Sequence, residues 1–321
     1  MEFNVAKIAL QHINQEDHAF HITTSRDKPS LIESIENIGL LALPTLWARS
    51  SGFTIVSGFR RIRACQQLGI QELTVRLVPG DTRPLDCLRI AVADNASQRP
   101  FNLIETARAI QRLKKYRPPD REFTAELAAL GLPTSRSMIT KLDQLGRLNT
   151  ELQAAVGDGA ICLNVALGAG ELSREDQMAV LGLFSQLRMS VSKQKEVLTF
   201  VKDIAGREKI SISEVLHCAT IRAIVDDDDL DRNKKTASIR RYLRKIRYPT
   251  LSQAEAQYHH TISLLKLGPH IRIDPPPGFE GTTHTLSLRF RNRQDLDAAY
   301  RNFGAALENP VLDSLFPKDS V

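Results

Sequence analysis

The sequence predicts an α+β multidomain protein with a small α/β unit at its amino terminus, an all-α middle and a small ββα unit at its carboxyl terminus. Three observations predict this organisation. Strand-like and helix-like segments alternate before residue 80, only helical periodicity follows up to residue 205, and two strand-like segments precede a helical pattern near the end. With 321 residues, 42% of them hydrophobic, the chain exceeds one ordinary core, so we expect two or three domains.

A pattern punctuated by glycines predicts the amino-terminal α/β unit. The segment SLIESIENIG predicts a short helix, because Ser30 and Glu33 have the spacing of a capping box and Gly39 ends the apolar periodicity. A strand, a helix and a second strand are then predicted at residues 53–56, 60–68 and 73–78. A glycine turn thus leads a strand into the amino terminus of a helix.

The middle and the end of the chain differ in their periodicity. Amphipathic spacing predicts helices at residues 88–96, 103–116, 122–130, 135–145, 150–156, 175–187 and 192–205. Near the end, HIRIDPPPGFEGTTHTLSLRF predicts two strands joined by a Pro and Gly loop, and residues 292–307 predict a closing helix. The domain bounds that these patterns predict are 1–100, 101–215, 216–250 and 251–321.

Charge and cysteine content limit the classes of function. The formal net charge is +6 and the pI is near 9.2, but Arg232 to Arg247 alone holds eight Lys or Arg and no acid. This local basicity favours a polyanionic partner. No segment approaches the about 20 apolar residues of a membrane span and the start lacks a signal-peptide pattern, so we expect a cytoplasmic protein with no membrane partner. The four cysteines lack CxxC or zinc spacing, which predicts reduced thiols.

The segment VSGFRRIRA predicts an anion site. Gly58 lets a ligand approach the backbone, and the helix that follows offers unpaired N–H groups and a partial positive charge. Arg60, Arg61 and Arg63 add bidentate donors that suit phosphate. An exposed basic helix start is the alternative that these residues leave open.

Three segments, in order along the chain, resemble the boxes of the ParB-like family. VSGFRRIRACQQLGI resembles the family box with its Gly-Glu-Arg-Arg-x-Arg-Ala core, and SIENIGLLALP is similar to the approach that precedes it. DNASQRPFNLIE is similar, without a gap, to a third box, with Asp94, Asn95 and Glu105 at its acid, asparagine and glutamate. The resemblance implies a ParB/sulfiredoxin-like amino-terminal domain followed by a helix-turn-helix DNA-binding domain.

In that family the boxes form a pocket for CTP and a divalent metal, and occupation of the pocket closes a dimeric clamp on DNA. One or two carboxylates together with phosphate oxygens suit Mg²⁺. Carried over residue by residue, the resemblance implies that phosphates are held by Gly58, Arg60, Arg61 and Arg63, and that the nucleotide and its Mg²⁺ are bound by Asp94 and Asn95.

Two departures from the family pattern bear on the chemistry. The family glutamate after the glycine is Phe59 here, and since a phenyl ring neither orients water nor accepts a proton, we expect CTP hydrolysis to be slow or absent. The family's Gln-Pro-Arg contact segment is replaced by FHITTSR, in which Arg26 is the candidate contact. Sulfiredoxin shares the fold, but Phe59 stands at its reactive cysteine and Cys65 lies farther along the helix, which argues against that activity.

Residues 122–145 predict the DNA reader, because two short helices flank a turn from Gly131 to Pro133. A helical hairpin within a bundle is the alternative. TSRSMITKLDQL is similar to a ParB segment that begins Lys-Ser-Arg-Ser, and its inner face is expected to hold Met138 or Ile139 with Leu142 and Leu145. The residues expected to face DNA are Ser135, Arg136, Ser137 and Lys141.

The basic stretch Arg232 to Arg247 is expected to be a helix, since Ile239, Leu243 and Ile246 share one face. A helix packed on a partner with DNA contact as a second use, a nonspecific DNA arm and a solvated face are its three interpretations. Residues 251–321 are expected to dimerise, as ParB carboxyl ends do.

The resemblance implies double-stranded DNA with a specific site, a second copy of the chain and a ParA-type Walker ATPase as partners. It also implies a nucleoid-associated location in the cytoplasm and a role in plasmid or chromosome partition. A ParB-type transcriptional regulator or repressor that acts locally at operators is the alternative.

Overall fold

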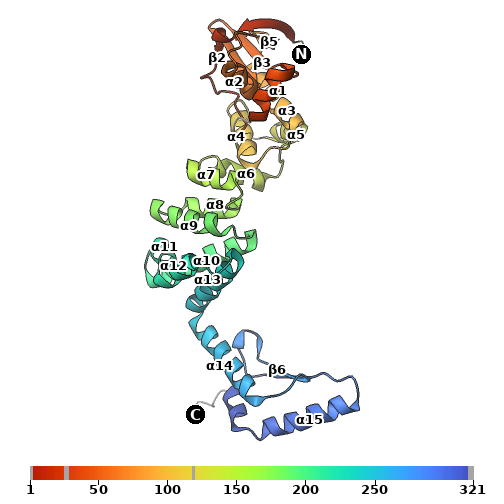
Figure 1. Ribbon diagram of the computed structural model, residues 1–321, viewed down its shortest axis with the longest axis vertical. Helices are drawn as coiled ribbons and strands as arrows, with labels where there is room; N and C mark the ends of the chain where they lie inside the picture. Colours follow the sequence, from red (N-terminus) through yellow and green to blue (C-terminus); the bar gives the residue numbers. More distant parts are fainter. Residues whose placement is uncertain (1–2, 25–28, 118–119, 317–321) are drawn as a thin grey trace. The chain divides into compact units, whose positions relative to one another are not determined.

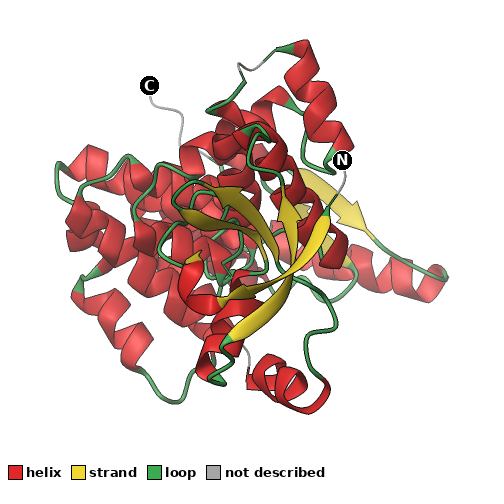
Figure 2. Cartoon of the chain, turned by 90° about the horizontal axis from the view of Figure 1, so that it is seen from above, coloured by secondary structure: helices red, strands yellow, loops and turns green. Residues whose placement is uncertain are grey.

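The computed structural model describes residues 3–24, 29–117 and 120–316. The chain divides into two units, Met1–Lys195 and Glu196–Val321. Each contains both helices and strands, and helices predominate (Figures 1 and 2). The predicted mixed α/β architecture is therefore confirmed in its coarse form.

A five-stranded mixed sheet begins the first unit, in the order β1-β5-β3-β4-β2. β3 runs antiparallel to β4 and parallel to β5. The strands are β1 Asn4–Ala9, β2 Ile13–Asn14, β3 Thr45–Arg49, β4 Gly52–Ser57 and β5 Glu72–Val78. The strands predicted at residues 53–56 and 73–78 are confirmed, whereas β1, β2 and β3 were not predicted. β1 is an edge strand with little burial, so its sequence lacks the alternation on which the prediction depends.

Two helices cover this sheet through one hydrophobic core. α1 spans Pro29–Ile38 and α2 spans Phe59–Gln67. Ile35 of α1 and Ile62 of α2 pack with Leu46, Ile55 and Val75 of the sheet. α1 ends at Gly39, whose φ of 84° only glycine adopts readily, as predicted. The predicted capping box was wrong, because the helix already begins at Pro29 and Ser30 lies inside it.

The rest of the first unit is helical, and all seven helices predicted between residues 88 and 205 are confirmed with shifted ends. α8 was not predicted, because its sequence LNVALGAG consists mostly of small residues and shows no polar stripe. The helices are α3 Pro84–Gln98, α4 Leu103–Lys114, α5 Arg121–Ala129, α6 Arg136–Leu145, α7 Thr150–Gly157, α8 Leu163–Gly170, α9 Arg174–Leu187 and α10 Val191–Glu208.

The second unit begins at Glu196, within α10, and continues with α11 Ile212–Leu216, α12 Ala219–Asp226, α13 Arg232–Arg247 and α14 Pro249–Leu265. The predicted ββα pattern is confirmed: β6 Ile271–Asp274 pairs antiparallel with β7 Thr285–Leu288, and α15 Arg293–Leu307 follows. Ile271 and Ile273 share a small core with Leu265 of α14 and Ala299 of α15. α14 was not predicted, and its burial of Leu265 makes it part of this fold.

Two predictions from composition can be compared with the fold. All four cysteines are free thiols, of which Cys65 and Cys87 are buried and Cys162 and Cys218 are partly exposed. Within residues 3–24, 29–117 and 120–316, no helix has both the length and the apolar character needed to cross a membrane.

Candidate functional site

The turn between β4 and α2 has the geometry that the sequence predicts. β4 ends at Ser57, Gly58 has a φ of 96° and a ψ of 21°, and α2 begins at Phe59. A Cβ at Gly58 would lie 3.0 Å from the Cα of Pro44, so a larger residue is excluded both by conformation and by space. Gly58 has no side chain to cap α2, so the N–H groups of the first turn of this helix remain available to an anion.

A cavity of about 450 Å³ opens at this turn. Its size falls within the range of small-molecule sites, about 300–1,000 Å³. Five of the six predicted nucleotide-binding residues line it: Gly58, Arg60, Arg61, Asp94 and Asn95. Arg63 is exposed and is not part of this lining.

Asp94 stands at the centre of a charge cluster in the cavity wall. Its Oδ2 accepts from the Ser57 hydroxyl and lies 3.4 Å from Nη2 of Arg61, and its Oδ1 lies 3.2 Å from Nη2 of Arg76. Burial lowers the pKa of Arg61, and the Asp94 carboxylate opposes that shift. Arg61 also donates to the carbonyl oxygens of Ala42, at 2.7 Å, and Leu43, at 3.1 Å. The cluster fixes the direction of the Arg61 guanidinium beside the cavity.

Sheet register explains why Arg76 and Ser57 belong to this cluster, although neither was predicted. Thr45 of β3 pairs with Ser57 on one side and with Arg76 on the other, so the end of β4 and the end of β5 lie at the same edge. Arg76 is the one charged residue inside the apolar run of β5, which is a signal for a second role. Its partner lies 18 residues away, beyond what local spacing reveals.

Two side chains of the cavity wall offer oxygen ligands to a Mg²⁺ that also binds phosphate. Asp94 offers a carboxylate, and Asn95 offers its amide oxygen, since its Nδ2 donates to the carbonyl of Ala91 at 2.8 Å. Mg²⁺ commonly takes one or two protein carboxylates together with phosphate oxygens and water. Among the described residues, no group of three or more His, Cys, Asp or Glu could hold a metal without a ligand's help. A cation at Asp94 therefore requires nucleotide phosphates and a shift of the arginines.

Phe59 lines the cavity and forms aromatic contacts with two histidines. It is 9% exposed, and its ring centroid lies 4.5 Å from that of His21 and 6.2 Å from that of His18. Burial, together with the neighbouring His18 and Arg112, lowers the pKa of His21 to about 4. The position of the family glutamate is thus occupied by the phenyl ring of Phe59, which packs against the neutral imidazole of His21.

Glu105 ties the segment before α1 to the amino terminus of α4. Its buried carboxylate accepts from the N–H of Thr24 at 2.8 Å, from Nη2 of Arg99 at 2.6 Å and from the N–H of Asn102 at 3.1 Å. Asn102 caps α4 in return. The resemblance singled out Glu105, and the structure gives it a positioning role. Arg26, the candidate contact of this segment, lies outside the described residues.

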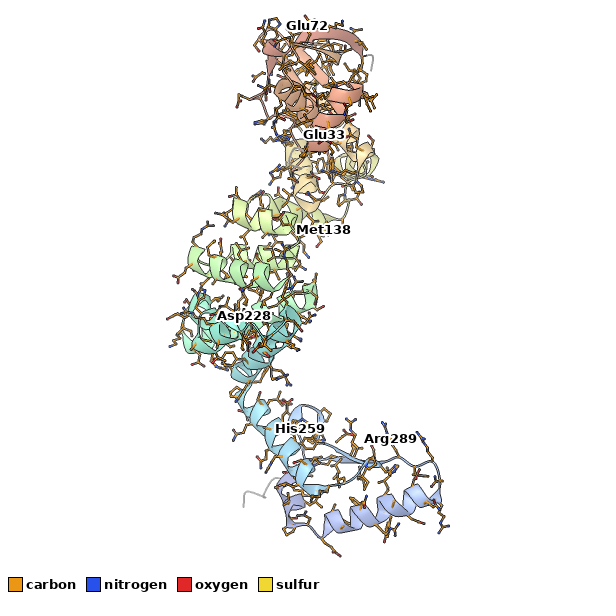
Figure 3. The ribbon with its side chains drawn as sticks, in the orientation of Figure 1. Glu33, Glu72, Met138, Asp228, His259 and Arg289 are labelled. Carbon is orange, nitrogen blue, oxygen red and sulfur yellow. The ribbon has the colours of Figure 1, made fainter. Side chains whose placement is uncertain are left out.

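The predicted helix-turn-helix consists of α5 and α6, joined by a turn in which Gly131 has a φ of 69°. Leu142 and Leu145 are fully buried, and Ile139 is the half-buried member of the predicted inner face. Met138 is 36% exposed and is labelled in Figure 3. Of the residues expected to face DNA, Ser135, Arg136 and Ser137 are exposed at the start of α6, whereas Lys141 is half-buried.

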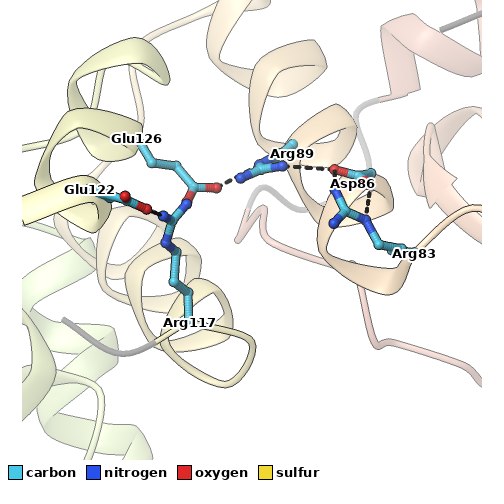
Figure 4. A network of polar contacts seen from close by, with 6 residues as sticks. All are labelled: Arg83, Asp86, Arg89, Arg117, Glu122 and Glu126. Atoms are coloured by element: carbon cyan, nitrogen blue, oxygen red, sulfur yellow. Dashed lines mark hydrogen bonds and ion pairs between the residues drawn. The ribbon is translucent and has the colours of Figure 1, made fainter. Parts of the chain in front are cut away.

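An ion-pair network links α3, which carries Asp94 and Asn95, to the first helix of this motif (Figure 4). Nε of Arg89 lies 2.6 Å from Oε1 of Glu126 in α5, and its Nη1 lies 2.8 Å from Oδ1 of Asp86. Arg117 pairs with the same Glu126 at 3.4 Å. The cavity and the helix-turn-helix are thus connected through charged side chains of one unit.

Comparisons with known proteins support the family resemblance. No protein-family model matches the chain. It is 28% identical over 179 residues to the probable chromosome 1-partitioning protein ParB of Deinococcus radiodurans, which covers 56% of this chain and 59% of that protein. It is 32% identical over 136 residues to a probable chromosome-partitioning protein ParB of Rickettsia conorii, which covers 42% of this chain and 44% of that protein. The matches thus span about half the length of these relatives.

A solved structure of a truncated Caulobacter crescentus ParB complexed to the centromeric parS site is 18% identical, and the match covers 60% of this chain and 98% of that one. The TM-score of this match is 0.36. The curated relatives and the three ordered boxes around Gly58 and Asp94 agree with one another. Over about half of their length, the chain is therefore similar to ParB chromosome-partitioning proteins.

Proposed function

We propose that this chain is a sequence-specific DNA-binding protein that acts in plasmid or chromosome partition as a dimeric clamp gated by CTP. One observation carries the proposal: an arginine-lined cavity and a helix-turn-helix lie in one unit, and α3 contributes to both. The curated relatives are named as chromosome-partitioning proteins, which supports partition as the process.

The residues that line the cavity support a nucleoside triphosphate as its ligand. Phosphates would meet the free N–H groups at the start of α2, with Arg60 and Arg61 as the cationic side chains of the wall. Arg63, on the exposed side of α2, would meet the outer end of the triphosphate. Cytosine is assigned because the three boxes resemble those of a CTP-binding family. Mg²⁺ would take Asp94 and Asn95 as its protein ligands.

Phe59 supports binding without efficient turnover. A general base must reach the attacking water, and the packed ring of Phe59 beside His21 offers no acceptor there. His21 is neutral at pH 7, since its pKa lies at about 4, but its ring lies against Phe59. We therefore assign nucleotide occupation, more than hydrolysis, as the signal that acts on DNA binding.

DNA reading is assigned to the exposed start of α6, where Ser135, Arg136 and Ser137 would meet base edges and Lys141 would meet the backbone. Residues 251–321 are assigned to dimerisation, and a ParA-type Walker ATPase is proposed as the protein partner.

Chromatin profiling of the tagged chain in its own host tests this function. Broad enrichment that spreads from one or a few sites is the expected result for a loaded clamp. Narrow peaks at promoters would instead assign the chain to the ParB-type transcriptional regulators that act at operators. Enrichment indistinguishable from a mock precipitation would contradict specific DNA binding altogether.

A further inference from the structure

The basic helix α13 holds two functionally different sets of cations. Arg232–Arg247 contains eight Lys or Arg and no acid. Four of these cations are bound within their own unit: Arg240 to Glu196 at 2.6 Å, Arg244 to Glu255 at 2.7 Å, Arg247 to Asp203 at 2.5 Å, and Lys235 to the carbonyl oxygen of Val225 at 2.6 Å. These contacts anchor α13 to α10, α12 and α14.

The second set forms a line on the opposite face. Thr236, Ile239 and Leu243 are the buried residues of α13. At about 100° per residue, Lys234, Arg241 and Lys245 lie within about 40° of one another on the side opposite that buried face. All three are exposed, and none of them forms an ion pair among the described residues. We call these three residues the cationic stripe.

The stripe has the length and chemistry of a phosphate contact. Eleven residues of helix separate its ends, which is about 16 Å at about 1.5 Å per residue. Double-stranded DNA carries one negative charge per about 1.7 Å of its axis, so a stripe of this length faces on the order of nine charges. Anchoring by the paired arginines keeps the helix backbone in place, and only the three side chains need to order on binding.

Other polyanionic partners fit the stripe less well. An interfacial membrane helix inserts an exposed apolar face, whereas the apolar face of α13 is buried in its own unit. A protein interface of ordinary size needs a desolvated apolar centre, and the stripe is flanked by the charged side chains of Arg240 and Arg244. Phosphate backbone requires neither feature.

We propose that the cationic stripe is a sequence-independent contact for the phosphate backbone of double-stranded DNA, separate from the helix-turn-helix. The inference rests on the proposed DNA-binding function and adds a second contact to it. Asp227, Asp228 and Asp229 precede α13, and Asp228 is labelled in Figure 3. Their negative charge weakens the phosphate contact near Lys234, so Arg241 and Lys245 make the stronger contacts of the stripe.

The test is the affinity of the full-length protein for a random-sequence duplex, measured by fluorescence anisotropy at several salt concentrations without nucleotide. The variant is Lys234→Gln with Arg241→Gln and Lys245→Gln. We expect its affinity to fall about tenfold or more, and the slope of log affinity against log salt to fall by about 2–3, because about three phosphate contacts are lost. Thermal unfolding that matches the wild type would show that the fold is intact.

A control removes the same charge elsewhere in the second unit, outside residues 251–321: Lys209→Gln with Arg222→Gln and Arg232→Gln, all of which are exposed. The stripe proposal requires this control to keep a wild-type salt slope. Equal losses in both triple variants would mean that total charge matters and no defined surface exists. Wild-type affinity in the stripe variant would also overturn the proposal, as would stripe-dependent binding to phosphatidylserine vesicles without any to DNA.

Arg136→Ala separates this proposal from the proposed function. If the stripe variant binds random DNA normally while Arg136→Ala weakens specific binding, the stripe is refuted and the proposed function stands. If no specific site exists but the stripe variant still loses random binding, the proposed function fails and the stripe stands.

Discussion

At the scale of single residues, the buried carboxylate of Glu105 stabilises the first unit by accepting hydrogen bonds from distant parts of the chain. Burial alone would raise its pKa, but hydrogen bonds from Arg99 and from the N–H groups of Thr24 and Asn102 outweigh burial and lower it to about 2. The folded pKa thus lies below the ordinary value of 4.5. The resulting stability is fully present above about pH 4.5 and is lost as the pH falls towards 2.

Removal of this charge should destabilise the first unit. We expect Glu105→Gln to lower the free energy of unfolding at pH 7 by about 2–4 kcal/mol, because Arg99 and two N–H groups lose an ionised acceptor. Urea unfolding followed by circular dichroism measures the change. Glu151→Gln is the control, since its pair with Arg174 is exposed to solvent and should contribute nothing measurable. Equal losses in both variants would refute the assignment.

His21 should make stability depend on pH in a different window. Its pKa of about 4 lies below the ordinary 6.5, so the unfolded chain binds the proton more readily between these values. Stability is therefore greatest above about pH 6.5 and decreases as the pH falls towards 4.

We expect His21→Phe, which keeps a ring against Phe59, to reduce that decrease by about 1–2 kcal/mol, after allowance for the partial exposure of His21. Urea unfolding at several pH values between about 4 and 7 gives the comparison. The exposed His12 supplies the control variant His12→Gln, which should behave as the wild type does. An unchanged pH dependence in His21→Phe would contradict the assignment.

Arg136 should carry sequence information. At the exposed start of α6 it is placed for a bidentate contact to guanine, so Arg136→Ala should weaken binding to the specific site by about 1–3 kcal/mol and relax the preference at one base position. Competition against single-base variants of the site would reveal this. Arg147→Ala, whose side chain is 75% exposed at the far end of the motif, is the control. Equal weakening on specific and random DNA would show that Arg136 contacts phosphate alone.

At the scale of elements, α3 joins the cavity to the helix-turn-helix. It supplies Asp94 and Asn95 to the cavity wall, and its Arg89 reaches Glu126 of α5. The side chain of Glu126 is only 8% exposed, so loss of its arginine partners would leave a buried carboxylate without an ion pair. A nucleotide that shifts α3 must therefore either move α5 with it or change the distance between Arg89 and Glu126.

A double-mutant cycle of Arg89→Gln and Glu126→Gln should reveal a coupling energy of about 1–2 kcal/mol in urea unfolding. The same cycle with Arg83→Gln in place of Arg89→Gln should reveal little coupling, because the Arg83 side chain is 73% exposed and pairs with Asp86. If both cycles gave the same value, the link between α3 and α5 would lie elsewhere.

The sequence predicted those elements whose signals are local. The glycine turn at Gly58, the strands β4 and β5 and most helices were recognised because capping, periodicity and glycine act over a few residues. The edge strands β1 and β2 were missed, since each pairs with a segment distant in sequence, and β3 was missed although it pairs with the neighbouring β4. α8 was missed because small residues leave no stripe.

The same distinction holds within the candidate site. Gly58, Arg60 and Arg61 follow one another in sequence and were predicted together. Arg76 was not, because only the register of β3 between β4 and β5 brings it to Asp94. The hydrogen bond from the Thr24 N–H to Glu105 joins residues that are 81 positions apart, and sequence periodicity does not reveal such a contact.

At the scale of the whole molecule, we propose that the two units have separate tasks. The first unit holds the arginine-lined cavity and the helix-turn-helix, to which we assign nucleotide binding and sequence reading. The second unit presents the cationic stripe and the ββα fold assigned to dimerisation. A nucleotide that binds in the first unit can then change how long a dimer stays on DNA without changing which sequence is read.

The most direct test is a calorimetric titration of CTP into the full-length protein. Mg²⁺ and the DNA site recovered by chromatin profiling are present in the solution. The account predicts one CTP bound per chain, no comparable heat with ATP, and loss of binding in Arg61→Ala, with Arg147→Ala unchanged. DNA that binds specifically while CTP gives no heat under these conditions would contradict the central claim.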